Sequence, residues 1–92
     1  MALLHDEAIE TLLEGSAWHK DGRAVVRDFE FGNFNDAVAF VNRVAIDAEK
    51  AGHHPDILIH DYREVQIRIS THTEGGITMR DIELASAIST LV

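Results

Sequence analysis

The sequence has no cysteine, a single proline and no long apolar run. The absence of cysteine excludes disulfides, thiolate metal sites and a cysteine nucleophile, and it fits the reducing cytoplasm, where we expect the protein to act. No segment approaches the roughly 18 apolar residues that a membrane-spanning helix needs. The acidic stretch from Met1 to Leu13 lacks the basic start and apolar run of a signal peptide. We therefore expect neither a membrane segment nor a leader.

Basic residues are also scarce. The chain has 8 Lys and Arg against 16 Asp and Glu, a formal net charge of −8 at pH 7. Such a surface repels phosphate backbones, so direct nucleic-acid binding is not expected. The 92 residues correspond to one domain, which can bury only about 60–65% of the surface that its unfolded form exposes. A domain that buries so little surface has a small margin of stability, so self-association is a reasonable expectation.

The first third of the chain predicts a helix and a β-hairpin. The helix covers Asp6 to Glu14, with Asp6 as its cap and a glycine after it. A short strand over Ala17–Lys20 and a longer one over Ala24–Phe31 are joined by the turn dipeptide Asp21-Gly22. The longer strand alternates apolar and charged residues, as expected for a sheet with one buried face.

A long central helix is predicted over Phe34–Ala51. Asn33 can cap its start, and Gly52 ends it. Apolar residues recur at helical spacing and predict the buried stripe. They are Phe34, Val38, Val41, Ala45 and Ala48, flanked by Phe40 and Val44.

The last part of the chain predicts two strands and a helix. The strands cover Ile57–His60 and Glu64–His72, and Gly75-Gly76 forms a flexible loop. Thr78 opens the last helix, with Asp81 three residues later as its capping-box partner. The element order is therefore α-β-β-α-β-β-α. It predicts an α+β fold with a four-stranded antiparallel sheet and three helices packed on one face.

Histidine is abundant, with six in 92 residues, and three are placed suggestively. His53 and His54 lie just after a helix end, and His72 closes the polar face of the last strand. Pro55 biases His54 toward an extended backbone, so the two adjacent side chains should point in opposite directions. Imidazole can give and take protons near neutral pH, which makes these three residues candidates for acid–base catalysis.

Other readings of these residues remain open at this stage. A histidine near a helix C-terminus is favourable with the helix dipole, without any catalytic role. Three histidines could also hold zinc, although their spacing is not a standard ligand motif. Asp81 could cap the last helix or orient His72 across the glycine loop. Spacing alone leaves catalysis and a structural role nearly balanced.

A resemblance to a known family changes this balance. The residues that carry it run from Ala48 through His53-His54-Pro55, then Tyr62, Thr71-His72, Gly75-Gly76-Ile77-Thr78 and Asp81. Upstream it extends through Trp18, Gly22-Arg23, Phe29, Phe31, Phe34 and Val44-Ala45. Together they resemble the pterin-4a-carbinolamine dehydratases, over nearly the whole chain from Trp18 onward.

The resemblance implies an enzyme of the hydro-lyase class. Its reaction is the dehydration of 4a-hydroxytetrahydropterin (4a-hydroxytetrahydrobiopterin) to quinonoid dihydropterin, with no metal and no organic cofactor. By position, His53, His54 and His72 match the family's catalytic histidines. The substrate contacts that the resemblance implies are Glu49, Ser70, Thr71, Thr73 and Asp81. It also implies a homodimer or homotetramer. The alternative is a non-enzymatic binding or regulatory module on the same scaffold.

Overall fold

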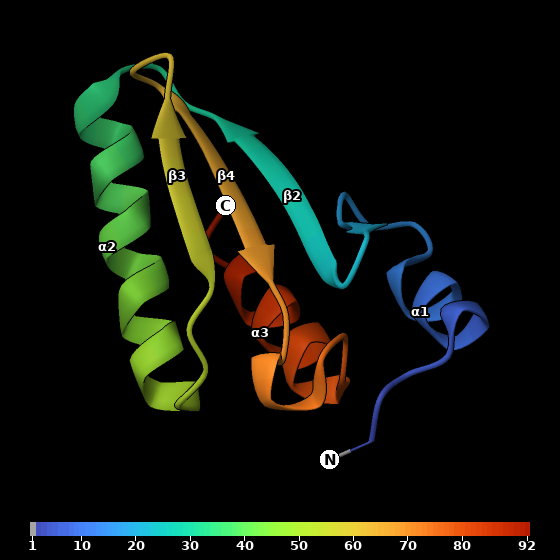
Figure 1. Ribbon diagram of the computed structural model, residues 1–92. Helices are drawn as coiled ribbons and strands as arrows, with labels where there is room; N and C mark the ends of the chain where they lie inside the picture. The colour runs from blue at the N-terminus through green and yellow to red at the C-terminus, as the bar shows by residue number, and fades with distance from the viewer. Residues whose placement is uncertain (1) are drawn as a thin grey trace.

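The computed structural model describes residues 2–92 and contains three α-helices and four strands in the predicted order (Figure 1). The predicted fold class is thereby confirmed. The elements are α1 (Asp6–Leu13), β1 (His19–Asp21), β2 (Ala24–Glu30), α2 (Phe34–Ala51), β3 (Asp56–His60), β4 (Glu64–Ile69) and α3 (Met79–Ser89). A short 3-10 turn covers His72–Glu74. Within residues 2–92, no helix has both the length and the apolar character that crossing a bilayer requires.

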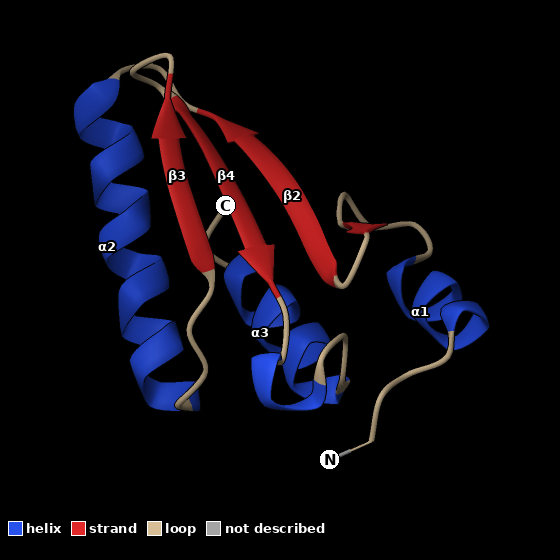
Figure 2. Cartoon of the chain, in the orientation of Figure 1, coloured by secondary structure: helices blue, strands red, loops and turns tan. Residues whose placement is uncertain are grey.

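The four strands form one sheet in the order β1-β2-β4-β3, and every neighbouring pair is antiparallel (Figure 2). β4 lies in the centre, so its residues pair on both sides. Ile67 stands opposite Arg27 on β2 and opposite Ile57 on β3. This register places the start of β3 beside the end of β4, and the start of β3 follows the C-terminal end of α2, where the histidines lie.

The core lies between the sheet and the helices. Side chains of strand residues alternate between the two faces, and Val65, Ile67 and Ile69 of β4 are fully buried under the helices. α2 and α3 contact each other and cover this face, while α1 lies beside β1 and adds the buried Ile9 to the same core. The opposite face is partly exposed and carries mostly polar residues.

The buried stripe of α2 differs from the predicted one. The buried residues are Ala37, Phe40, Val44 and Ala48. Phe34, which was expected inside, is 53% exposed, and Ala45 is exposed as well. Several apolar sets fit the helical period along α2, and the sequence does not say which one faces the sheet. The ring of Phe40 decides it by packing against Phe29 and Phe31 of the β2 region.

The prediction for the end of β4 was too long. The strand ends at Ile69, and Thr71 then pairs only with Gly76 in an isolated bridge. Gly75 adopts a left-handed conformation (φ 75°), which lets the chain turn back on itself. His72 therefore lies in the 3-10 turn rather than on the strand. The predicted Asp6 cap is also wrong, since His5 holds the cap position of α1 and makes no side-chain cap bond.

Candidate functional site

The end of α2 places the two adjacent histidines. Gly52 is left-handed (φ 61°), and its N–H donates to the carbonyl of Glu49 at 3.2 Å. The next N–H, that of His53, donates to the carbonyl of Ala48 at 3.1 Å. This pair of bonds is the Schellman closure of a helix, which satisfies carbonyls that would otherwise be orphaned. It fixes the backbone from which both histidines project.

His53 is buried and bonded to a carboxylate. Its Nε2 lies 2.6 Å from Oδ1 of Asp81, and the two side chains are 9% and 0% exposed. The other carboxylate oxygen accepts from the Thr71 hydroxyl and from the Thr78 N–H, both at 2.8 Å. A carboxylate held this way favours the His53 tautomer with hydrogen on Nε2, which leaves the lone pair on Nδ1.

His54 points away from His53, as predicted for adjacent residues of an extended segment. Its side chain is 64% exposed. Its Nε2 lies 3.5 Å from Oε2 of Glu49, one turn back on α2, and that carboxylate is also exposed. Glu49 can therefore orient the His54 ring from outside.

Six of the eight predicted site residues, including all three histidines, line one cavity of about 260 Å³, which we call the histidine pocket. One wall comes from the segment after α2 and another from the segment after β4. The lining residues are Gly52, His53, His54, Ser70, Thr71, His72, Thr73 and Arg80. Besides the three histidines, the predicted residues in this lining are the substrate contacts Ser70, Thr71 and Thr73.

Two predicted contacts lie outside this lining. Asp81 is fully buried behind His53, so any effect it has on a ligand passes through that ring. It also completes the predicted capping box with Thr78 at the start of α3. The sequence allows two roles for Asp81, capping α3 or orienting His72. The cap is present, and the carboxylate contacts His53 rather than His72. Glu49 stands at the edge, beside His54.

Arg80 is a pocket residue that the sequence did not reveal. Its Nη2 donates to the carbonyl of Gly52 at 2.8 Å, which ties the start of α3 to the end of α2. One signal was present: a cation in the first turn of a helix is disfavoured by the helix dipole. An arginine directly before the capping-box residue Asp81 therefore indicates a contact outside its own helix, here with the Gly52 carbonyl.

Two further features bear on the predictions. Tyr62, part of the resemblance, lies in the β3–β4 turn with a positive φ of 55° and is 61% exposed, outside the histidine pocket. Among residues 2–92, one group of three side chains has donor atoms close enough to share a metal ion, within 4.8 Å of one another. It consists of His60, Asp61 and Glu64 and includes none of the three pocket histidines.

The fold and the pocket together define a class of protein. It is an α+β domain in which a buried carboxylate holds one histidine at the wall of a pocket that two further histidines line. The family profile described as "Pterin 4 alpha carbinolamine dehydratase" matches residues 2–91. The chain belongs to this family.

Relatives agree with this assignment. A protein of Thermomicrobium roseum is 51% identical over 92 residues, covering 99% of this chain and 98% of its own length. One from Acidobacterium capsulatum is 46% identical over 93 residues, covering both chains completely. Both carry the name pterin-4-alpha-carbinolamine dehydratase as a provisional assignment.

Two solved structures share the fold. A transcriptional coactivator/pterin dehydratase from Brucella melitensis superposes with a TM-score of 0.89 at 31% identity, over 96% of each chain. A pterin dehydratase-like protein described as a RuBisCO assembly factor in the alpha-carboxysome gives a TM-score of 0.64 at 23% identity. It covers 80% of this chain and 84% of its own. At that identity the second likeness concerns the fold alone.

Proposed function

We propose that this protein dehydrates 4a-hydroxytetrahydropterins to quinonoid dihydropterins by histidine acid–base catalysis. The observation that carries the proposal is the 2.6 Å contact between His53 and the buried Asp81 at the wall of the histidine pocket. In this reaction the C4a–O bond breaks and the hydroxyl leaves as water. The N5–H bond also breaks, and its electron pair forms the new C4a=N5 double bond.

His53 is the proposed base at N5. In the tautomer that the Asp81 carboxylate favours, Nε2–H donates to Asp81 and Nδ1 has the free lone pair. When Nδ1 takes the proton, the ring becomes an imidazolium, and the adjacent carboxylate stabilises that charge. Thr71 and the N–H of Thr78 hold the carboxylate, so it is already oriented before the reaction.

His72 is the proposed acid that protonates the leaving hydroxyl. C4a and N5 are neighbouring ring atoms, so the acid and the base must reach the same bond, and the pocket offers a histidine from each of two walls. His53 comes from the segment after α2, and His72 comes from the segment after β4. His54 contacts the pterin ring between His53 and His72, and Glu49 orients the imidazole of His54. Ser70 and Thr73 supply the polar contacts of the facing wall, while the buried hydroxyl of Thr71 holds Asp81.

A dehydration assay tests this function directly. An aromatic amino-acid hydroxylase generates the 4a-carbinolamine, and its decay is followed with and without this protein. We expect faster decay with the wild type, and loss of that effect in His53→Ala and His72→Ala proteins whose circular dichroism is unchanged. General acid–base groups contribute about 100-fold or more each. Decay at the uncatalysed rate with the wild-type protein would reject the function.

The second candidate is a non-enzymatic role in binding a partner protein. It is favoured by the likeness to the Brucella melitensis protein at 31% identity, which is described as a transcriptional coactivator as well as a pterin dehydratase. A pull-down from cells that produce this chain would test it. Recovery of no stoichiometric partner besides the chain itself would count against this candidate.

The proposal includes the pterin as the one small-molecule partner and a cytoplasmic location. It also includes a single domain over residues 1–92 and its assembly into a homodimer or homotetramer. Its support is the family to which the chain belongs. Light scattering coupled to size-exclusion chromatography measures the oligomer. A mass near the 10.2 kDa of one chain would contradict that part of the proposal.

A further inference from the structure

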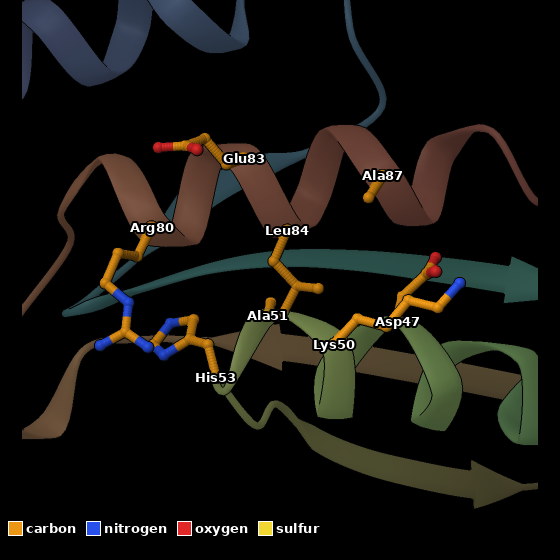
Figure 3. Close-up of a pocket in the computed structure, with 8 residues that line it drawn as sticks. All are labelled: Asp47, Lys50, Ala51, His53, Arg80, Glu83, Leu84 and Ala87. Atoms are coloured by element: carbon orange, nitrogen blue, oxygen red, sulfur yellow. The ribbon is translucent and has the colours of Figure 1, made fainter.

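A second cavity adjoins the histidine pocket. It lies between α2 and α3, has a volume of about 510 Å³, and is called the α2–α3 groove here (Figure 3). Its walls come from both helices and from the segment that follows α2. The lining residues are Asp47, Lys50, Ala51, His53, Arg80, Glu83, Leu84 and Ala87.

The two cavities meet at two residues. His53 and Arg80 line both the histidine pocket and the α2–α3 groove. In Figure 3 the guanidinium of Arg80 lies beside the imidazole of His53, at one end of the groove. These two side chains form the boundary between the cavities, so a ligand that contacts His53 in the histidine pocket lies one side chain away from the groove.

The volumes show that the histidine pocket alone is small for a substituted pterin. Small-molecule sites usually measure about 300–1,000 Å³. The histidine pocket has about 260 Å³, which suits a fused two-ring system with little else. With the groove's 510 Å³ beside it, the combined site can take a ring and a side chain of several atoms.

The chemistry of the ring says where that side chain would emerge. N5, whose proton His53 is proposed to accept, is bonded directly to C6, and C6 carries the substituent that varies among pterins. A group on C6 therefore lies within two bonds of the atom that contacts His53. The free space beside His53, beyond the ring, is the α2–α3 groove.

The lining of the groove suits a particular kind of substituent. Ala51, Leu84 and Ala87 form its apolar middle. Lys50 and Asp47 carry their charged groups away from the His53 end, where they lie together in Figure 3. A chain with carbon atoms near the ring and hydroxyl groups at its end would bury the former and hydrogen-bond the latter.

We propose that the α2–α3 groove binds the C6 substituent of the pterin, with Ala87 and Lys50 as specificity-determining residues. The preferred substrates then carry a C6 side chain of several atoms with a polar end, rather than a methyl group. This inference rests on the proposed dehydratase function. It adds the part of the substrate that the histidines do not contact.

The test compares two substrates and two matched variants. The substrates are the 4a-carbinolamines of 6-methyltetrahydropterin and of tetrahydrobiopterin, whose C6 group is a dihydroxypropyl chain. Ala87→Phe fills the groove, whereas Ser86→Phe adds the same ring at the exposed neighbouring position of α3, outside the lining. The quantity measured is kcat/KM for the dihydroxypropyl substrate divided by that for the methyl substrate.

We expect Ala87→Phe to lower this ratio about tenfold or more, the range seen when a pocket cannot accept extra methylene groups. Ser86→Phe should leave it within twofold. Lys50→Met should lower it about fivefold, which corresponds to one hydrogen bond of about 1 kcal/mol. Binding of the stable 6-methyl and dihydroxypropyl 7,8-dihydropterins, measured by calorimetry, should follow the same order.

Two failures can be told apart. If the wild type dehydrates both substrates and Ala87→Phe leaves the ratio of kcat/KM unchanged, the groove proposal is overturned and the dehydratase function stands. If the wild type accelerates neither dehydration, the function itself is rejected, and the groove proposal falls with it. A ratio that changes equally in Ala87→Phe and Ser86→Phe also overturns the groove proposal, because the effect would not come from filling the groove.

Discussion

At the scale of single residues, Asp81 has the most constrained side chain of the site. It is fully buried and accepts hydrogen bonds at both oxygens, from His53 on one side and from Thr71 and the Thr78 N–H on the other. A buried carboxylate is tolerated only when such partners satisfy it. The same bonds make it both a helix cap and the orienting group for His53.

The first prediction concerns Asp81→Asn. The amide keeps the size of the side chain but places a donor where Asp81 now only accepts, so it no longer stabilises a protonated His53. We expect kcat for dehydration to fall about 100-fold. The free energy of unfolding should fall by about 1–3 kcal/mol, the cost of leaving a buried polar group unsatisfied. Asp28→Asn, on the exposed face of β2, is the control and should change neither quantity.

The outcome for catalysis is separable from the outcome for stability. If Asp81→Asn loses stability but keeps the wild-type kcat at a temperature where it is folded, Asp81 is a helix cap alone. Urea denaturation and the dehydration assay on the same preparation distinguish these two results.

The second prediction concerns Asp21 at the end of β1. Arg68 donates to its carboxylate at 2.9 Å, and this hydrogen bond and the guanidinium charge hold the pKa of Asp21 below its ordinary value. A lowered carboxyl pKa stabilises the fold above the unfolded-state pKa. That contribution disappears as the pH falls through the folded-state pKa, so the effect belongs to the acid range, below about pH 4.

An NMR titration of the Asp21 carboxyl carbon measures this. We expect Arg68→Gln to return the pKa of Asp21 toward its ordinary value, while Arg63→Gln, at the other end of β4, leaves it lowered. An unchanged titration of Asp21 in Arg68→Gln would show that the ion pair does not persist in solution.

At the scale of elements, the end of α2 carries the most consequence, because one glycine both stops the helix and aims the histidines. Gly52 is left-handed, and a Cβ built on it would meet nothing within 4 Å. Any cost of adding a side chain there is therefore conformational strain and not a clash. A substitution at Gly52 therefore measures the requirement for a left-handed backbone without a contribution from side-chain packing.

The third prediction follows from that geometry. Gly52→Ala should lower the free energy of unfolding by about 1–2 kcal/mol, the cost of placing an L-residue in the left-handed region. Gly52→Asn should lose less, since asparagine tolerates this region. Gly32→Ala is the matched control: its φ is ordinary and its nearest neighbour would be 3.8 Å away. Urea unfolding followed by Trp18 fluorescence measures all three, and equal losses at Gly52 and Gly32 would contradict the argument.

At the scale of the whole molecule, one core joins the helices to the sheet. It takes Ile9 from α1, Val25 from β2, Phe40 from α2, Ile67 from β4 and Leu84 from α3. The single tryptophan, Trp18, is 4% exposed and packs edge-on against Phe29. Its indole N–H donates to the hydroxyl of Ser89 near the end of α3.

The fourth prediction is that the chain unfolds in one transition. Because every layer contributes to the same core, Trp18 fluorescence and the helical circular dichroism signal should give the same urea midpoint. The slope should be about 1 kcal/mol per molar urea, as for a domain of this size. Separate midpoints for the two probes would show that α1 and β1, beside Trp18, unfold independently of α2 and α3.

Much of this architecture was predictable, because it depends on local patterns. The alternation along β2 and β4, the bounds of α2 and the capping box of α3 all follow from periodicity and capping chemistry. The His53-His54-Pro55 and His72 set, with its family resemblance, indicated the site. What failed was not local in origin: the buried stripe of α2 and the end of β4 depend on which neighbours the chain meets in the fold, and periodicity does not contain that information.

The sequence by itself therefore determined the elements, their order and the three histidines of the candidate site. Only the tertiary structure decided how they work together. Asp81 lies 28 residues from His53 along the chain, and the packing of α3 against the end of α2 brings them into contact. The same packing brings Arg80 to the histidine pocket and opens the α2–α3 groove beside it. Contacts between distant segments depend on how the helices pack on the sheet, which no local pattern encodes.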